Sequence, residues 1–280
     1  MGETSVAVVT GAASGLGLGL AAGLVARGMS VVIADINGDA LARAQQRLRV
    51  DGAEVLAVRT DVTKDDEVAA LASRTLDQFG RVDIVCLNAG VNLRGRAWEL
   101  SVDDWRWIYD VNVFGVVHGI RSFVPILLEE GAGHVLITAS NSAVATLPAL
   151  APYVSSKHAV LALAETVQHD LLEVGSDVRV SVVLPGAIRS GMADAVRNRP
   201  ADYGSAQVSA EVLHASRAFL ERYGSDPRTM ADDILRQALD KHCFCVFTDP
   251  ADTATLLTHA QALGEGRLPT VTAPVFQENR

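Results

Sequence analysis

The chain has 280 residues, of which 49% are hydrophobic and 20% charged. This composition excludes global disorder and supplies enough apolar material for a core on both faces of a sheet. The formal net charge of -9, with no run of Lys and Arg, argues against a nucleic-acid partner. No window reaches the roughly 18 uninterrupted apolar residues of a membrane span, and the first residues lack the pattern of a secretory signal. We therefore expect no membrane partner.

Three cysteines, Cys86, Cys243 and Cys245, cannot form a disulfide framework. An odd number in a chain of this length suits a reducing compartment, so we expect a cytoplasmic location. His242, Cys243 and Cys245 could be considered as metal ligands, but a second pair of ligands is missing from this segment. Alternate residues of a strand point to one face, and free cysteine is usually buried. We therefore favour a core strand with both cysteines on one face, and no metal site.

A repeated unit organises the chain: a short β-branched run, a turn rich in glycine or acidic residues, and a longer stretch with helical periodicity. The predicted strands span residues 6–10, 31–34, 54–60, 83–87, 134–139, 178–184 and 243–247. The predicted helices span residues 15–27, 38–50, 64–79, 102–130, 152–174 and 230–241. This alternation predicts a single α/β domain of Rossmann type, with a doubly wound parallel β-sheet and helices on both faces.

Two segments do not follow the repeat. Residues 189–227 contain glycines and prolines between short amphipathic pieces, and we expect them to form an inserted lid over a substrate site. Residues 268–280 show little periodicity and are predicted to be an irregular tail. Residues 1–267, lid included, would then form the folded domain.

A glycine-rich turn follows the first predicted strand and opens the first predicted helix. Residues 10–17 read TGAASGLG, with the spacing T-G-x-x-x-G-x-G. Glycines allow a tight turn and a close approach of the backbone, and the amino end of the helix presents free N–H groups to a pyrophosphate. We expect a dinucleotide to bind at Gly11, Ser14, Gly15, Leu16 and Gly17. A glycine-rich turn without a ligand is the alternative.

Asp35 ends the second predicted strand, twenty residues after Gly15. A carboxylate at this position can accept hydrogen bonds from both hydroxyls of a ribose. The same charge would repel a 2′-phosphate, and Ser14, Ile36 and Asn37 supply no positive charge to neutralise that phosphate. We therefore expect Asp35 and Ile36 to contact the cofactor, and NAD to be favoured over NADP. An acidic helix cap is the alternative interpretation of Asp35.

Tyr153 and Lys157 are four residues apart on a predicted helix, so their side chains share one face. A phenol titrates near 10, and a neighbouring ammonium can lower its pKa by about 1–3 toward the range useful for proton exchange with an alcohol. Ser140 lies at the end of the fifth predicted strand, on the sheet edge that faces ligands, where its hydroxyl can bind a substrate oxygen. These residues predict proton chemistry on an alcohol or a ketone.

Two further polar residues allow more than one interpretation. Asn112 lies among apolar neighbours in the long predicted helix, so it needs a polar partner. A hydrogen-bonded buried asparagine without a chemical role is the alternative. His158 could serve as a base for a nucleophilic Ser140, but no acid or oxyanion arrangement of hydrolase type surrounds them. We therefore disfavour a hydrolase.

In order and spacing, these motifs resemble the short-chain dehydrogenase/reductase family. The resemblance is carried by TGAASGLG (10–17), Asp61-Val62, Asn88-Ala89-Gly90, Asn112, Ser140, YVSSK (153–157) and Pro185-Gly186, and it is strong over about residues 5–190. Three positions depart from the common pattern of the family: Leu87 replaces an asparagine, Ala139 replaces a serine and Ser190 replaces a threonine. Ser190 keeps the hydroxyl, so none of these changes threatens catalysis.

The resemblance implies roles for individual residues. Tyr153 would be the general acid/base, Ser140 would orient the substrate, and Lys157 would also hold the nicotinamide ribose. Asn112 would anchor a water that relays protons to Lys157. The remaining cofactor contacts would be Asp61, Val62, Asn88, Ala89, Gly90, Pro185, Gly186, Ile188 and Ser190. The resemblance also implies a homotetramer, with a homodimer as the smaller assembly.

We therefore predict an oxidoreductase that transfers a hydride between NAD and a secondary alcohol or its ketone. The candidate substrate residues are Ser140, Asn141, Ser142, Leu147, Leu150, Tyr153, Gly186, Ala187 and Met192, and they favour a hydrophobic or aromatic small molecule. A non-catalytic NAD-binding sensor on the same fold is the alternative. A dehydratase or epimerase of the extended type would need a longer carboxyl-terminal domain and a T-G-x-x-G-x-x-G turn, which this sequence does not have.

Overall fold

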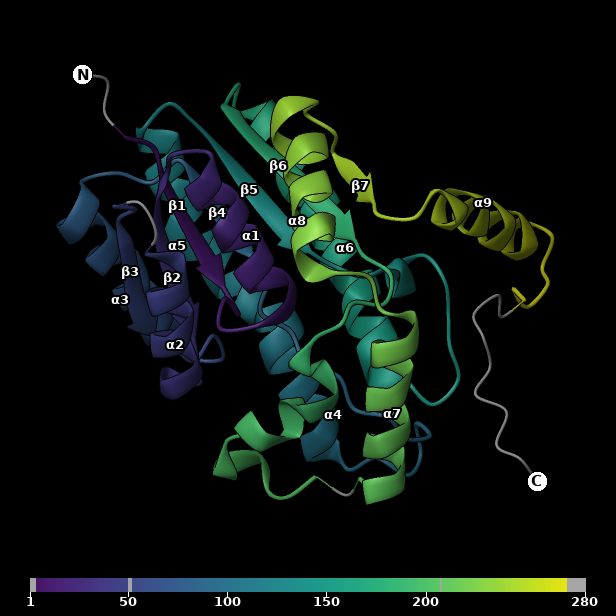
Figure 1. The fold of residues 1–280 in the computed structure, drawn as a ribbon. Coiled ribbons are helices and arrows are strands. Elements are labelled where there is room, and N and C mark those ends of the chain that lie inside the picture. The colour runs from purple at the N-terminus through teal and green to yellow at the C-terminus, as the bar shows by residue number, and fades with distance from the viewer. Residues whose placement is uncertain (1–3, 50–51, 207, 271–280) are drawn as a thin grey trace.

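The computed structural model describes residues 4–49, 52–206 and 208–270. In this part of the chain, seven parallel strands form one sheet in the order β3-β2-β1-β4-β5-β6-β7 (Figure 1). The strands are β1 (Val6–Thr10), β2 (Ser30–Asp35), β3 (Val55–Arg59), β4 (Ile84–Leu87), β5 (Ala132–Thr138), β6 (Asp177–Leu184) and β7 (Cys245–Phe247). All seven predicted strands are present, with ends that differ by at most two residues, so the prediction of a doubly wound parallel sheet is confirmed.

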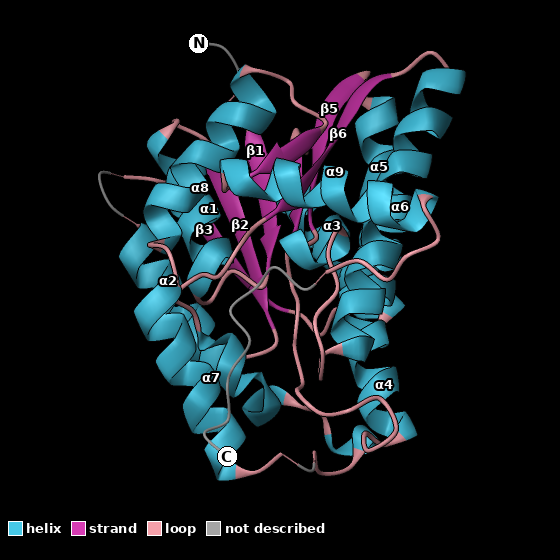
Figure 2. Ribbon diagram, turned by 90° about the vertical axis from the view of Figure 1, so that its right-hand side faces the viewer, coloured by secondary structure: helices cyan, strands magenta, loops and turns pink. Residues whose placement is uncertain are grey.

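Helices cover both faces of this sheet. The α-helices of the described residues are α1 (Gly15–Ala26), α2 (Gly38–Leu48), α3 (Asp65–Phe79), α4 (Val102–Tyr109), α5 (Gly115–Glu129), α6 (Ala151–Glu173), α7 (Ala210–Tyr223), α8 (Pro227–Leu235) and α9 (Pro250–Gly264). Figure 2 shows the sheet between α1, α2 and α8 on one side and α5 and α6 on the other. This single-domain Rossmann-type arrangement is the one that the repeated unit predicted.

The continuous apolar runs of the strands result from burial on both faces. In β1, Val8 packs into the apolar cluster of one face, whereas Ala7 and Val9 pack into the cluster of the other face. All five residues of β1 are buried. Chain order reverses beside β1, which pairs with β2 on one side and β4 on the other. Ligands of open α/β sheets bind at the carboxyl ends of the strands at such a switch point.

The long predicted helix over residues 102–130 forms as three consecutive helical pieces. A π-helical segment, Asp110–Phe114, lies between α4 and α5. The run Val102–Glu129 has the length and the mean hydropathy, 1.6, of a membrane-crossing helix, and 39% of its most apolar window is buried. Phe123 and Leu127 of this run belong to the core cluster on the sheet. The expectation of no membrane partner remains a prediction.

The carboxyl-terminal part differs from the prediction in two ways. α9 was not predicted, and Figure 1 shows it projecting from the body of the domain beyond β7. β7 begins only at Cys245, and Cys243 packs with the apolar cluster on the opposite face of the sheet from Cys245. The expectation that both cysteines share one face is therefore wrong, because Cys243 lies before the strand. Residues 271–280 of the predicted tail lie outside the described residues.

The predicted lid, residues 189–227, contains two short 3₁₀ helices and α7. The 3₁₀ helices span Gly191–Asn198 and Ala201–Tyr203. Figure 2 shows α7 and α4 beyond the carboxyl ends of the strands, at the lower end of the view. The lid segment is therefore close to the edge of the sheet at which ligands bind.

Candidate active site

A cavity of about 1070 Å³ lies at the carboxyl edge of the sheet. Among its lining residues are the predicted cofactor contacts Gly11, Ser14, Gly15, Leu16, Gly17, Asp35, Ile36, Asp61, Val62, Asn88, Ala89, Gly90, Pro185, Gly186, Ile188 and Ser190. It is also lined by Ser140, Asn141, Ser142, Leu147, Leu150, Tyr153, Lys157, Ala187 and Met192. The structure therefore brings every predicted site residue except Asn112 to one cavity.

The glycine-rich turn between β1 and α1 leaves no space for larger residues. Gly11 and Gly15 have φ of +65° and +54°, in the left-handed region that favours glycine. A Cβ atom on Gly17 would lie 2.2 Å from the carbonyl oxygen of Gly11, and one on Gly15 would lie 2.8 Å from Cβ of Ser190. At these glycines the amino end of α1 therefore offers only backbone to the cavity, the arrangement that suits a pyrophosphate.

Asp35 is held at the cavity edge by backbone N–H groups on both sides. Its Oδ2 accepts a hydrogen bond from the N–H of Ala13 at 3.1 Å, and its Oδ1 accepts one from Asn37 at 3.0 Å. Burial raises the pKa of Asp35, and these hydrogen bonds act in the opposite direction. The N-cap of α2 is Asn37, whose Oδ1 accepts a hydrogen bond from Ala40 at 3.0 Å. Asp35 is therefore not the cap of α2.

Asn88 joins the ends of three strands beside the cavity. Its backbone N–H donates to Oγ1 of Thr10 at 2.9 Å, and its Nδ2 donates to the carbonyl of Thr10 at 3.0 Å. Its Oδ1 accepts a hydrogen bond from the hydroxyl of Thr138 at 3.2 Å. The side chain therefore fixes the relative position of β1, β4 and β5. Thr138 was not among the predicted site residues.

Tyr153, Lys157 and Ser140 meet at the buried end of β5. α6 carries Tyr153 and Lys157, and Lys157 Nζ lies 5.8 Å from the centre of the Tyr153 ring. Lys157 Nζ also donates a hydrogen bond to the carbonyl of Thr138 at 2.9 Å. The hydroxyl of Ser140 accepts a hydrogen bond from the N–H of Ser142 at 3.1 Å. A phenol, an ammonium and a hydroxyl therefore share one buried corner of the cavity.

Burial dominates the ionisation of this corner. Burial raises the pKa of Tyr153 above its ordinary value of 10, and a hydrogen bond with Ser140 acts in the opposite direction. Burial lowers the pKa of Lys157 to about 8. The pKa of Tyr153 is therefore raised, whereas a neighbouring ammonium was expected to lower it. The reason is that both groups lose solvation in the same corner, which disfavours the charged form of each.

Asn112 lies outside the cavity, in the π-helical segment between α4 and α5. Its Nδ2 donates hydrogen bonds to the carbonyl of Val91 at 3.1 Å and to Oγ of Ser156 at 3.0 Å. Its Oδ1 accepts a hydrogen bond from the N–H of Val91 at 2.8 Å. A Cβ atom on Gly90 would lie 3.5 Å from both Asn112 Oδ1 and Lys157 Nζ. The side chain therefore joins α6 to the loop after β4, with both amide hydrogens in use.

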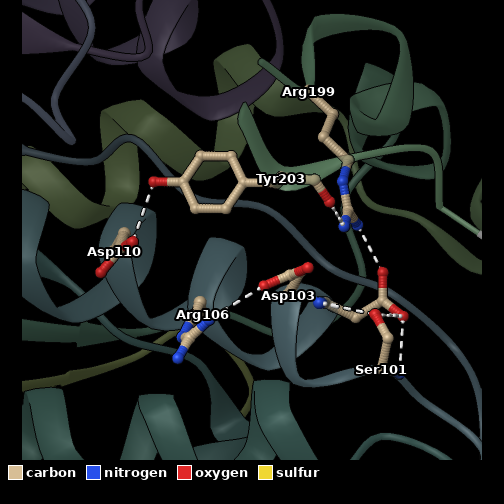
Figure 3. Close-up of polar contacts among 7 residues, drawn as sticks. Ser101, Asp103, Arg106, Asp110, Arg199 and Tyr203 are labelled. Carbon is tan, nitrogen blue, oxygen red and sulfur yellow. Dashed lines mark hydrogen bonds and ion pairs between the residues drawn. The ribbon is translucent and has the colours of Figure 1, made fainter. Parts of the chain in front are cut away.

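A buried ion pair attaches residues 189–227, the predicted lid, to α4 (Figure 3). Arg199 Nη1 donates to Oδ1 of Asp104 at 2.5 Å, and each side chain is only 3% exposed. Arg199 Nη2 donates to the carbonyl of Tyr203 at 2.6 Å, and the Tyr203 hydroxyl donates to Oδ2 of Asp110 at 2.9 Å. A further hydrogen bond, from Nδ2 of Asn37 to Oδ1 of Asn198 at 3.2 Å, attaches the lid to the loop after β2.

The lid anchor gives a first prediction. Replacing Arg199 with methionine leaves the buried carboxylate of Asp104 without its ionic partner. We expect Arg199→Met to lower the free energy of unfolding by about 3 kcal/mol, measured by urea denaturation. Arg228→Met is the matched control, because Arg228 and Asp232 form an exposed pair, whose loss costs less than about 1 kcal/mol. Equal losses in both variants would contradict a buried ion pair.

The burial of Lys157 gives a second prediction, on stability and pH. Below the folded pKa of about 8 the protein must carry a buried ammonium, which opposes folding; above the ordinary value of 10.5 the cost vanishes. We expect Lys157→Met to be more stable than the wild type at pH 7, with a difference that shrinks between pH 8 and pH 10.5. Urea denaturation across this range, without added dinucleotide, measures the difference. A constant difference would contradict the lowered pKa.

Comparisons with known proteins agree with this geometry. The short chain dehydrogenase family matches residues 5–201. The 1-deoxy-11-beta-hydroxypentalenate dehydrogenase of Streptomyces exfoliatus is 42% identical over 212 residues, which cover 75% of this chain and 76% of that protein. A CLA biosynthesis dehydrogenase/reductase of Lactiplantibacillus plantarum is 32% identical over 258 residues, 89% of each protein.

A solved structure extends the likeness to nearly the whole chain. A short-chain dehydrogenase/reductase from Burkholderia phymatum, solved in complex with NAD, superposes with a TM-score of 0.91 at 38% identity. The match covers 98% of this chain and 99% of that one. This chain therefore belongs to the short-chain dehydrogenase/reductase family and is an oxidoreductase that uses NAD or NADP.

Proposed function

We propose that this protein is an NAD-dependent dehydrogenase/reductase that interconverts a secondary alcohol and its ketone. The observation that carries the proposal is the buried corner of Tyr153, Ser140 and Lys157, which opens into the same cavity as the glycine-rich turn and Asp35. A non-catalytic sensor would bind the dinucleotide without needing a phenol and an ammonium in this desolvated corner.

The protein groups would handle the proton while the dinucleotide, when bound, accepts or donates the hydride. Ser140 would hold the substrate oxygen, and Tyr153 would take its proton during oxidation or return it during reduction. Because burial raises the pKa of Tyr153, the phenol needs additional positive charge nearby to act as a base. The ammonium of Lys157 and the positive ring of the oxidised cofactor would supply it. A water held by an oxygen of Asn112, whose amide hydrogens are both in use, would then exchange protons with Lys157.

The substrate would be a hydrophobic or aromatic small molecule. Leu147, Leu150 and Met192 line the cavity together with apolar side chains of α7, such as Leu213 and Leu220. Both α7 residues lie in residues 189–227, the segment predicted to form a lid, but the sequence pattern did not single them out as pocket residues. The name of the Streptomyces relative describes a hydroxylated substrate. An alcohol as the reacting group here fits that name.

Residues 1–267 would form the catalytic domain, with residues 189–227 as a lid that closes over the substrate. We further propose a homodimer or homotetramer in the cytoplasm. Phe114, Leu128 and Leu172 are 49%, 41% and 62% exposed on the π-helical segment, α5 and α6. A second copy packed on these helices would remove that apolar surface from water.

Replacing the phenol tests the proposed reaction directly. We expect Tyr153→Phe to lose at least about 10³-fold in kcat with any alcohol that the wild type oxidises, because it lacks the proton-accepting oxygen. NAD affinity, measured by calorimetry, should stay within about threefold, since the ring and its packing remain. Formation of NADH, followed by its absorbance, measures turnover on a panel of hydrophobic secondary alcohols.

Tyr109→Phe is the matched control, because Tyr109 stacks on Trp105 away from the cavity. It should retain wild-type turnover. Full activity in Tyr153→Phe would contradict the role of Tyr153. NAD binding by a wild type that turns over none of the alcohols or ketones would favour the sensor instead.

Asp35 gives a separate prediction on cofactor preference. Its carboxylate would bind the ribose hydroxyls of NAD and repel the 2′-phosphate of NADP. The preference for NAD is the kcat/KM with NAD divided by the kcat/KM with NADP. We expect Asp35→Ala to lower this ratio by about tenfold or more. The double variant Asp35→Ala with Ser14→Arg should lower the ratio further. Asp39→Ala removes an exposed acid of α2 and should leave the ratio unchanged. An unchanged ratio in Asp35→Ala would refute this role.

A further inference from the structure

The first turn of α9 forms part of the wall of the cavity. Asp249 caps this helix, its side chain accepting a hydrogen bond from the N–H of Ala251 at 2.9 Å. Ala251, Asp252 and Thr255 of the helix line the same cavity as Ser140 and Tyr153. α9 therefore brings a carboxylate, Asp252, to a cavity whose other parts come from the strand ends and the lid.

Asp252 is connected to Ser140 through one intervening side chain. Its Oδ1 accepts a hydrogen bond from Nδ2 of Asn141 at 3.3 Å. Oδ1 of Asn141 in turn accepts a hydrogen bond from the hydroxyl of Ser140 at 3.3 Å. The carboxylate is thus two hydrogen bonds away from the hydroxyl proposed to hold the reacting oxygen. A substrate bound at Ser140 that reaches past Asn141 would meet this carboxylate.

The second oxygen of Asp252 is buried and has no hydrogen-bond partner within the described residues. A buried carboxylate oxygen without a donor costs free energy, so such atoms usually have a function or bind a ligand. Burial and the nearby charge of Asp249 also raise the pKa of Asp252, and the hydrogen bond from Asn141 acts in the opposite direction. Because Asp252 lines the cavity, a rotation of its carboxylate would turn this oxygen toward a donor on the substrate.

We propose that Asp252 determines substrate specificity by accepting, at Oδ2, a hydrogen bond from a second hydroxyl group of the substrate. The substrate class is then a diol or hydroxyketone with an apolar or aromatic group. This inference rests on the proposed function and deepens it. A site built to bind a hydroxyl discriminates strongly against an analogue without it, because the protein group is then left unpaired.

Asp252→Asn tests the proposal with matched aromatic substrates. It keeps the size of the side chain and can still accept the hydrogen bond from Asn141, but an amide replaces the carboxylate. The probes are 1-phenylethanol, 1-phenylethane-1,2-diol and 1-phenylpropane-1,3-diol, each with NAD. We expect the wild type to oxidise at least one diol with a kcat/KM about tenfold or more above that for 1-phenylethanol, as a charge-assisted hydrogen bond predicts.

In Asp252→Asn, this preference should fall about tenfold or more, mainly through a higher KM for the diol. The kcat/KM for 1-phenylethanol should stay within about threefold. Glu265→Gln is the control, because it removes an exposed carboxylate at the far end of α9. Its preference for the diol should equal that of the wild type.

Two kinetic results would overturn the proposal: no preference for either diol in the wild type, or an equal loss of kcat for all three alcohols in Asp252→Asn. The second would mean that Asp252 only positions Asn141 and Ser140. Calorimetric binding of the alcohols to the protein saturated with NAD tests the same contact without turnover. Diol binding that weakens in Asp252→Asn supports the contact even if the proposed reaction fails, and unchanged binding refutes it.

Discussion

The hydrogen bond from the buried ammonium of Lys157 to the carbonyl of Thr138 is the contact around which this site is built. It ties α6 to the end of β5, while the hydroxyl of the same threonine donates to Asn88, which binds Thr10 at the end of β1. A displacement of α6 would leave an ammonium buried without a partner, which is costly. The helix that carries Tyr153 is therefore held in register with the strands that bear the glycine-rich turn.

Motifs whose residues lie close together in the sequence could be predicted. The turn of residues 10–17, Asp35 at the end of β2, and the pair Tyr153 and Lys157 on one helical face each lie within a short stretch of chain. Strand and helix order then determines that all of them reach the carboxyl edge of one sheet. Their convergence on one cavity follows from these local patterns and the rules of chain connection.

Contacts between distant segments could not be predicted in this way. Arg199 and Asp104 are 95 residues apart, and Asn141 and Asp252 are 111 apart, with no pattern in the sequence that relates them. α9 itself has little core contact, with Ala262 as its buried residue, so no apolar stripe indicates a helix there. The sign of the Tyr153 pKa shift is a similar case, because the extent of burial depends on packing from several elements.

In the proposed reaction, chemistry and specificity come from different parts of this fold. Strand ends and α6 hold the phenol, ammonium and hydroxyl through backbone carbonyls and buried side chains, so these groups tolerate little movement. Residues 189–227 and α9 reach the same cavity from outside the repeated β-α unit. Polar contacts between Arg199 and Asp104 and between Asp252 and Asn141 help to attach them. Under the proposed function, changes in these two segments can therefore alter which substrate binds while the position of Tyr153 relative to Lys157 is maintained. The carboxylate of Asp252 on α9 fits this division, since in our proposal it binds the substrate away from the reacting carbon.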